Sequence, residues 1–238
     1  MHTLHNTALD TLVTRHFDRW WHSTGAWVEP ANQRRGGESG VQLLQPREPS
    51  HKPLYCKRQS GHTYRSLLHP LGRPTILRER QAYRALARIG VKTPTIVYCA
   101  ARQQQGQWQA LLVTEALQGF VSLEQWYASA PSAEFRRAVM RQLATTLATL
   151  HLARWQHGCC YPKHIFVKTQ LGLPGEVLAE IALLDLEKSR RRWRARDAAR
   201  HDLRQLARHR GTMPEADLND VLQAHQSALQ APTGVLLP

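Results

Sequence analysis

The sequence predicts an α+β protein in two parts: a small, mainly antiparallel β part with one helix, followed by a mostly helical part. In the first half, short apolar runs are bounded by turns rich in glycine, proline and polar residues. After Gly119, apolar residues recur at the three- and four-residue spacing of buried helices. Strands first and helices second are typical of the α+β class. We expect the boundary within residues 117–122, which gives parts that span residues 1–117 and 118–238.

Length and composition narrow the class of protein. The chain has 238 residues, enough for one large domain or for two lobes that share a cleft. No run approaches the roughly 18 apolar residues of a membrane-spanning helix, and the N-terminal residues lack the pattern of a secretory signal. The four cysteines have no zinc-finger spacing, and adjacent Cys159 and Cys160 are ill suited to a disulfide framework. These features predict a cytoplasmic protein without a transmembrane segment.

Charge is the strongest bulk signal. The chain carries 32 Lys and Arg against 18 Asp and Glu, a formal net charge of +14. Such a field attracts anions and accelerates their encounter, although it does not determine the fold. Nucleic acid, an anionic membrane face and a phosphorylated glycolipid are therefore candidate partners. The alternative is that the charge only keeps the protein soluble.

The first thirty residues carry an apolar stripe at roughly helical spacing. It either packs on the protein itself or lies on a membrane surface. The segment is short and its polar face is mixed, which favours packing on the protein. The stripe consists of Leu9, Leu12, Val13, Phe17, Trp20 and Trp21.

A glycine-rich segment lies between two strand signals. Gly36, Gly37 and Gly40, followed by Val41, form the pattern G-G-x-x-G-V. Glycines at such a place let backbone amides approach phosphate oxygens without a Cβ atom in the way. Taken alone, a glycine-rich hairpin is usually only a turn, so its interpretation depends on the residues that follow.

The next strand and the next helix each contribute one charged residue. The strand expected over residues 54–59 carries Lys57, and the helix expected over residues 74–90 carries Glu79. Glu79 lies four residues before Tyr83 on the helix's apolar stripe, where a buried carboxylate needs a partner. A strand-to-helix ion pair would hold the ammonium in place to neutralise phosphate charge. The alternative is a surface Lys and a half-exposed Glu.

Two motifs follow one another in the second half. A buried helix over residues 135–152 runs into HGCCYPKHIF, and LLDLE places Asp185 21 residues after His164. This is the order of a protein-kinase-like C-lobe, in which a loop H-R-D-x-x-x-x-N precedes an apolar strand ending in a metal-binding Asp. Asp185, with Glu187 expected to point the same way, suits a hard cation such as magnesium. A helix cap or a surface loop is the alternative for Asp185.

Together these segments resemble the lipopolysaccharide kinase family, which has a two-lobed protein-kinase-like fold, and within it the InaA-like branch. The resemblance covers about residues 30–210. It implies ATP and Mg²⁺, with Mn²⁺ as an alternative, and phosphate transfer to a sugar of the lipopolysaccharide core or a related glycolipid. It further implies a place in the cytoplasm or on the anionic inner-membrane surface. The matching segments are NQRRGGESGV, Lys57, PTILRE with Glu79, HGCCYPKHIFVK, LLDLEKSRRR and RHDLRQLARH.

The resemblance also implies roles for single residues. Lys57 would pair with Glu79 and touch phosphate, while Asp185 would hold magnesium around the same triphosphate. Glu115 to Leu117 would form the hinge that faces the adenine.

The catalytic-type loop departs from the family pattern. Cys159 occupies the place of the catalytic Asp, and His164 occupies that of the Asn that helps to ligate the metal. A thiol with a reference pKa of about 8.5 accepts a proton poorly, and imidazole suits softer metals than magnesium. The nucleotide-holding half of the machinery is therefore expected to be intact, and the acceptor-activating half is altered.

Several interpretations of this loop stay open. His157 acts as the base, the acceptor needs no strong base, or the protein is a pseudokinase that binds nucleotide without transferring phosphate and serves as a stress-linked sensor or scaffold. A metal or redox cluster of His157, Cys159, Cys160 and His164 is less favoured, because all four share one short loop.

The segment from Lys188 to Arg210 is strongly basic. It holds ten Lys or Arg against two Asp, and Trp193 interrupts it. In a kinase-like fold it would lie beside the acceptor site, where clustered arginines could recruit a phosphorylated glycolipid or an anionic leaflet. A solvated charged helix is the alternative. Nucleic acid is the less favoured partner, because it does not account for Lys57, Glu79 and Asp185 in this order.

Overall fold

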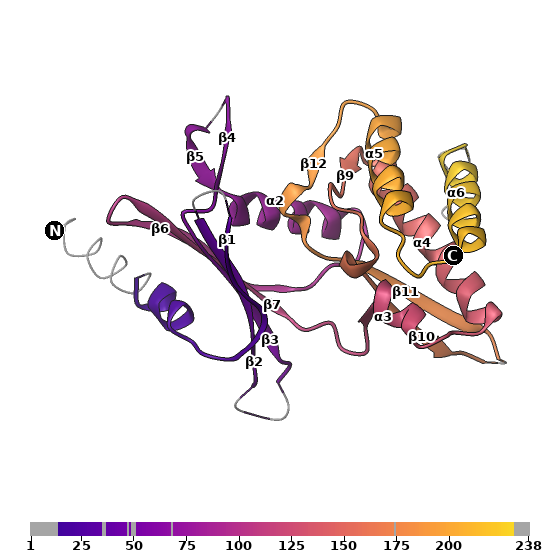
Figure 1. Cartoon of the computed structure of the whole chain (residues 1–238), viewed down its shortest axis with the longest axis horizontal. Helices are drawn as coiled ribbons and strands as arrows, with labels where there is room; N and C mark the ends of the chain where they lie inside the picture. Colours follow the sequence, from indigo (N-terminus) through magenta and orange to yellow (C-terminus); the bar gives the residue numbers. More distant parts are fainter. Residues whose placement is uncertain are drawn as a thin grey trace. The chain divides into compact units, whose positions relative to one another are not determined.

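The computed structural model describes residues 14–34, 37–46, 48, 51–67, 69–173 and 175–230. The chain forms two compact units, one of residues 1–80 and 95–116 and the other of residues 81–94 and 117–238 (Figure 1). The assignment of residues 1–117 and 118–238 to two functional lobes stays a prediction.

The first unit contains a five-stranded sheet in the order β1-β2-β3-β7-β6. Every neighbouring pair is antiparallel, as the sequence predicts. The polar QQQGQ segment forms the turn between the last two strands, with Gln105 and Gly106 at positive φ. The strands are β1 (Ala26–Arg34), β2 (Gly37–Leu44), β3 (Leu54–Ser60), β6 (Ile96–Gln104) and β7 (Gln107–Glu115).

Helical residues 14–21 pack against one face of this sheet. Phe17 is buried, and Trp20 contacts the core formed by Leu44, Cys56 and Val113. The prediction that the N-terminal stripe packs on the protein itself is therefore confirmed for Phe17 and Trp20. Leu9, Leu12 and Val13 lie outside the described residues.

A hairpin that the sequence did not predict precedes the helix of this unit. It consists of β4 (Thr63–Ser66) and β5 (His69–Pro74), and the chain then enters α2 (Thr75–Arg88). Pro74 thus ends a strand instead of opening the helix. The Thr75 hydroxyl donates a hydrogen bond to Gln59 Oε1 at 2.8 Å, which joins the helix start to β3. The predicted helix and its buried stripe, including Tyr83 and Leu86, are confirmed.

Two glycines of the G-G-x-x-G-V pattern lie where the chain packs closely on itself. A Cβ atom on Gly37 would lie 2.7 Å from backbone atoms of Gly61 and His62. A Cβ atom on Gly40 would lie 2.8 Å from the ring of Trp27. Packing within the unit therefore requires glycine at both positions, whatever they bind. Gly36 lies outside the described residues.

The second unit is built around α4 (Ala133–Leu152). Its apolar face is fully buried at Val139, Leu143, Leu147 and Leu150, and it packs against α6 and β11. The helix predicted over residues 135–152 is confirmed, and it begins two residues earlier than predicted. The other elements are β8 (Val121–Ser122), α3 (Leu123–Ala128), β9 (Trp155–Gln156), β10 (Ile165–Leu171), β11 (Val177–Leu183), β12 (Arg190–Arg191), α5 (Ala195–Arg208) and α6 (Glu215–Gln230).

Short strands hold the catalytic-type loop in place in this unit. Strands β11, β10 and β8 form one antiparallel sheet, and β12 pairs with β9. The loop from His157 to His164 therefore lies between two strand pairings, β9 before it and β10 after it. Within the described ranges, no helix is both long enough and apolar enough to cross a bilayer.

Candidate functional site

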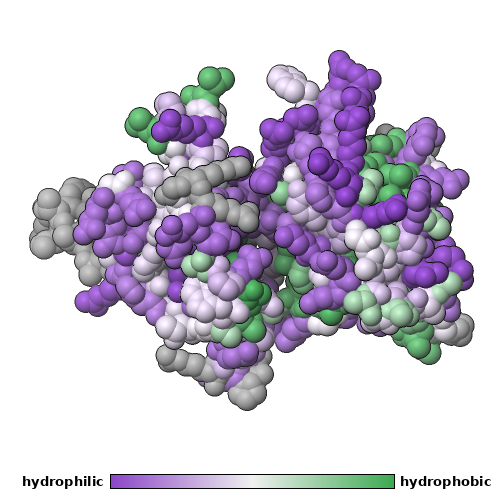
Figure 2. Space-filling model, viewed as in Figure 1, coloured by the Kyte–Doolittle hydropathy of each residue, from purple (hydrophilic) through white to green (hydrophobic). Residues whose placement is uncertain are grey.

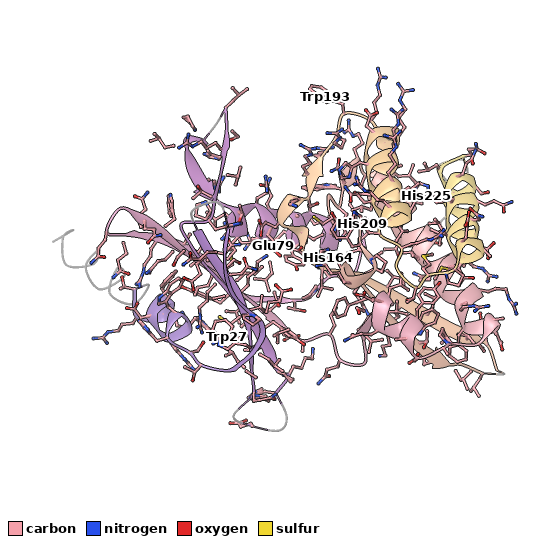
Figure 3. The ribbon with its side chains drawn as sticks, in the orientation of Figure 1. Trp27, Glu79, His164, Trp193, His209 and His225 are labelled. Atoms are coloured by element: carbon pink, nitrogen blue, oxygen red, sulfur yellow. The ribbon has the colours of Figure 1, made fainter. Side chains whose placement is uncertain are left out.

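A buried ion pair joins β3 to α2. The Nζ atom of Lys57 lies 2.9 Å from Glu79 Oε2, and the side chains are 16% and 3% exposed (Figure 3 labels Glu79). A buried charge is costly unless it is paired and hydrogen-bonded, and each of these groups provides the partner that the other requires. The structure thus contains the predicted strand-to-helix pair. Its role toward phosphate stays a prediction.

The predicted hinge residues lie where the chain leaves the first unit. Glu115 ends β7, and its carboxylate accepts a hydrogen bond from Lys52 Nζ at 2.8 Å. Its backbone amide donates to the Thr95 carbonyl at 2.9 Å. Leu117 is the first residue of the following segment of the second unit. An adenine-facing role for either residue stays a prediction.

The carboxylate of Asp202, on α5, fixes the start of the catalytic-type loop. Its Oδ2 atom accepts the backbone N–H of His157 at 2.6 Å, and Oδ1 accepts that of Gly158 at 3.0 Å. Gly158 has a φ of +88°, and a Cβ atom there would lie 2.5 Å from the Lys188 carbonyl oxygen. Only glycine fits this turn, and only an acceptor from α5 satisfies its two buried amides.

Asp202 also belongs to a buried histidine network. His151 Nε2 lies 3.2 Å from Asp202 Oδ2, and His151 Nδ1 lies 2.8 Å from His225 Nε2. Burial acts to raise the pKa of Asp202, but the hydrogen bonds from His151 and the Gly158 amide outweigh it and lower that pKa. Burial, with the nearby His151, lowers the pKa of His225 to about 4. The network therefore holds an ionised carboxylate beside a neutral His225 at pH 7.

The sequence reasoning gave Asp202 no role, although its segment belongs to the family resemblance. One local signal was available. Asp202 lies on the same helical face as Ala198 and Leu206, whereas the other charged residues of α5 lie elsewhere. An acidic residue on the apolar stripe of a basic helix indicates a buried acceptor.

Cys159 is buried in the loop at the place of the expected catalytic Asp. Burial is the main cause that raises the pKa of its thiol, and the nearby Asp185 adds to this, while Lys188 acts against it. Cys159 is therefore a protonated thiol at neutral pH. A protonated thiol cannot take up the proton of an acceptor hydroxyl.

His157, the alternative base, is fully buried. Its pKa is lowered to about 4, chiefly by burial, although Asp202 acts to raise it. Its Nε2 atom has no hydrogen-bond partner in the described part of the chain, and its Nδ1 atom accepts the backbone N–H of Cys159 at 3.3 Å. A buried ring with a lowered pKa is a weak proton acceptor at neutral pH, and a catalytic role for His157 stays a prediction.

His164 and Asp185 meet at the other end of the loop. His164 Nε2 lies 3.3 Å from Asp185 Oδ2, and His164 Nδ1 lies 2.9 Å from the Cys159 carbonyl oxygen. Asp185 follows β11 in the left-handed region, with a φ of 54°. Such a backbone conformation costs about 1–3 kcal/mol and persists where the surrounding structure imposes it, often at functional sites.

The expectation that Glu187 points the same way as Asp185 rested on an extended strand, and that premise is wrong. Asp185 adopts the left-handed conformation, and Leu186–Lys188 form a 3₁₀ turn. The two-residue alternation of a strand therefore does not apply here. A metal-ligating role for Glu187 stays a prediction.

The described residues contain no group of three or more His, Cys, Asp or Glu side chains that could hold a metal ion. His157, Cys159, Cys160 and His164 are thus not gathered into a metal cluster. Magnesium in phosphoryl-transfer sites takes one or two carboxylates and completes its shell with water and substrate phosphates. Asp185 fits that requirement, whereas the imidazole of His164 suits softer metal ions better than magnesium.

The sequence of this chain matches a known protein family and a known relative. Residues 18–225 match the model of the lipopolysaccharide kinase (Kdo/WaaP) family. The chain belongs to the lipopolysaccharide kinase (Kdo/WaaP) family. It is also 45% identical over 209 residues to Protein InaA of Escherichia coli (strain K12), covering 86% of this chain and 93% of that protein.

A solved structure shares the fold of this family member. The structure, described as WaaP in complex with acyl carrier protein, matches with a TM-score of 0.62 at 21% identity. The match covers 89% of this chain and 82% of the other. The predicted α+β, protein-kinase-like fold is therefore confirmed.

Replacing Asp202 tests its role in fixing the loop. Asp202→Ala leaves two buried amides and His151 without their acceptor, so we expect the free energy of unfolding to fall by about 3–5 kcal/mol. Asp202→Asn keeps one acceptor oxygen, so its free energy of unfolding should fall by less than that of Asp202→Ala. Urea unfolding measures both. Asp197→Ala, in the first turn of the same helix, should cost no more than about 1 kcal/mol; equal losses at positions 197 and 202 would contradict the role of Asp202.

The buried histidines predict a direction for the pH dependence of stability. His157 and His225 have a pKa of about 4 in the folded protein, against about 6.5 in an unfolded chain. Between these values the unfolded chain binds more protons, so the free energy of unfolding falls as the pH drops from about 6.5 to 4. The slope is about 1.4 kcal/mol per pH unit for each such group. Urea unfolding across this range should show the loss.

His225→Gln should flatten that slope, whereas His209→Gln, at an exposed position, should leave it unchanged. A free energy of unfolding that is independent of pH between about 6.5 and 5 would contradict burial of these rings in neutral form.

Proposed function

We propose that this family member is an ATP-dependent phosphotransferase that phosphorylates a sugar of the lipopolysaccharide core or a related anionic glycolipid. The observation that carries the proposal is the buried Lys57–Glu79 ion pair. Such a pair serves to hold an ammonium in position against nucleotide phosphates. Membership of the lipopolysaccharide kinase family supports the acceptor class.

The residues predicted to bind the nucleotide and the metal ion receive the following roles under this proposal. Lys57, oriented by Glu79, binds phosphate, and Asp185 with His164 holds the divalent ion. Magnesium, or Mn²⁺ as the alternative, would neutralise phosphate charge as transfer proceeds. Further predicted contacts with the nucleotide are those of Gly36, Gly37 and Gly40 with phosphate and those of Glu115 and Leu117 with adenine, and Glu187 is a further predicted metal ligand.

The altered loop sets the expected rate. Positioning and electrostatic stabilisation provide most of the rate enhancement in phosphoryl transfer. A positioned general base typically contributes a further factor of about 10²–10⁴. Cys159 is a protonated thiol and His157 is enclosed, so the proposed enzyme works without that factor. We therefore propose transfer that is slow compared with a kinase that has an Asp at this position.

The state of Cys159 also favours a second candidate function. A member that binds nucleotide but transfers no phosphate would act as a pseudokinase in a stress response. The specific observation is that both candidate proton acceptors, Cys159 and His157, are buried and lack basicity at neutral pH. Turnover by the wild-type protein separates the two functions.

The test is phosphate transfer from ATP to lipopolysaccharide core oligosaccharide, followed with radiolabelled ATP and magnesium. We expect slow transfer by the wild type, no transfer by Lys57→Ala, and at least tenfold faster transfer by Cys159→Asp, because a carboxylate restores the general base. Lys168→Ala, which removes a half-exposed ammonium elsewhere, is the matched control and should transfer at the wild-type rate.

The outcomes separate the proposals. Transfer by Cys159→Asp but not by the wild type would favour the pseudokinase. No transfer by any variant, with no binding of ATP, would contradict the phosphotransferase and the pseudokinase together.

A further inference from the structure

The outer side of α5 carries a row of arginines, called here the arginine ridge. Its members are four residues apart and therefore lie on one side of the helix. All four are exposed, and the opposite side of the helix, with Ala198, Asp202 and Leu206, is buried. Figure 2 shows hydrophilic side chains over the outer surface of this helix. The ridge consists of Arg196, Arg200, Arg204 and Arg208.

Among the described residues, no carboxylate forms an ion pair with this ridge. Across the part of the chain that the structure describes, the ion pairs include none with a ridge arginine, although Asp197 lies on the same helix. Like charges four residues apart destabilise a helix. The ridge is therefore an unfavourable arrangement within the chain itself, and an external anion would relieve it.

The start of α5 carries further positive charge. Arg190 and Arg191 form β12, and Arg194 is the N-cap residue without a side-chain hydrogen bond to the helix. Cations at a helix N-terminus oppose the helix dipole, whereas anions there are stabilised. The positive end of the helix and the ridge therefore attract the same kind of partner.

Trp193 supplies an apolar anchor next to these charges. Its side chain is 93% exposed, and Figure 3 shows it at the outer end of the loop between β12 and α5. Tryptophan is enriched where membranes meet water, because its ring is apolar and its N–H is polar. Clustered arginines attract the surface of anionic bilayers, and an exposed Trp beside them matches the residues enriched at membrane interfaces.

We propose that the arginine ridge and Trp193 bind the surface of an anionic bilayer. Guanidinium groups of the ridge contact lipid phosphates, which they match with two parallel hydrogen bonds. Trp193 enters the boundary between headgroups and acyl chains. Binding of this kind requires neither nucleotide nor phosphate transfer, so it stands or falls independently of the proposed enzymatic activity.

The test is flotation of the full chain with vesicles at physiological ionic strength. One set is phosphatidylcholine alone, and the other contains phosphatidylcholine and phosphatidylglycerol. We expect binding to the anionic vesicles only. Each Lys or Arg near such a surface strengthens binding about fivefold, so the triple variant Arg196→Gln, Arg200→Gln, Arg204→Gln should bind about 100-fold more weakly.

A matched control removes the same charge elsewhere. Arg84, Arg137 and Arg141 are exposed on α2 and α4, and changing all three to Gln should weaken binding far less than the ridge variant does. Trp193→Ser should reduce binding, and Trp193→Tyr should keep most of it. Thermal unfolding midpoints check that each variant folds.

Two results would overturn the proposal. Equal losses in the ridge and control variants would show that net charge alone drives binding. Tighter binding to duplex DNA than to anionic vesicles at the same ionic strength, lost in the ridge variant, would assign the ridge to nucleic acid.

Discussion

The candidate site depends first on one buried electrostatic interaction, the ion pair between Lys57 and Glu79. Taking two charges out of water costs several kcal/mol each, so an apolar pair of similar size would often serve stability as well. Removing one partner, by contrast, leaves a buried charge uncompensated. What the pair provides is position: β3 and α2 fix its two ends, and the ammonium has a defined direction relative to the sheet. This constraint is the physical basis for assigning phosphate binding to the first unit.

In the second unit, the catalytic-type loop has a thiol at the place of the expected catalytic Asp, and contacts on both sides of it fix the loop. Asp202 binds the amides at the start of the loop, Gly158 fits the only space available, and His164 spans from the Cys159 carbonyl to Asp185. These contacts are made by backbone groups and by the side chains of Asp202, His164 and Asp185, and none involves the thiol of Cys159. The conformation of the loop around Cys159 is therefore fixed independently of its side chain. The proposed slow transfer and the proposed absence of transfer are both compatible with this arrangement.

Much of the fold and part of the candidate site could be predicted from the sequence, because the patterns that indicate them are local or depend on the order of motifs along the chain. The apolar stripe of α2 placed Glu79 inward, and a strand before it supplied Lys57, so the pair followed from periodicity. The apolar stripe of α5 indicates that Asp202 is buried, but its partners could not be predicted, since they belong to a loop more than forty residues earlier in the chain. In the hairpin β4–β5, apolar and polar residues alternate only weakly. Pro74 is a residue type that is common at the start of a helix, although it ends β5 here. The direction of Glu187 relative to Asp185 could not be predicted, because a left-handed residue at 185 interrupts the strand, which periodicity does not reveal.

The central proposal is that Lys57 binds nucleotide phosphate and that Asp185 holds the metal ion of the nucleotide. The affinity for ATP, measured by isothermal titration calorimetry with and without magnesium, tests it most directly. We expect Lys57→Ala to weaken binding at least tenfold in both conditions, because it removes a direct phosphate contact. Asp185→Ala should weaken binding only when magnesium is present, because it removes a metal ligand. Wild-type affinity in both variants, with and without the metal, would contradict the claim.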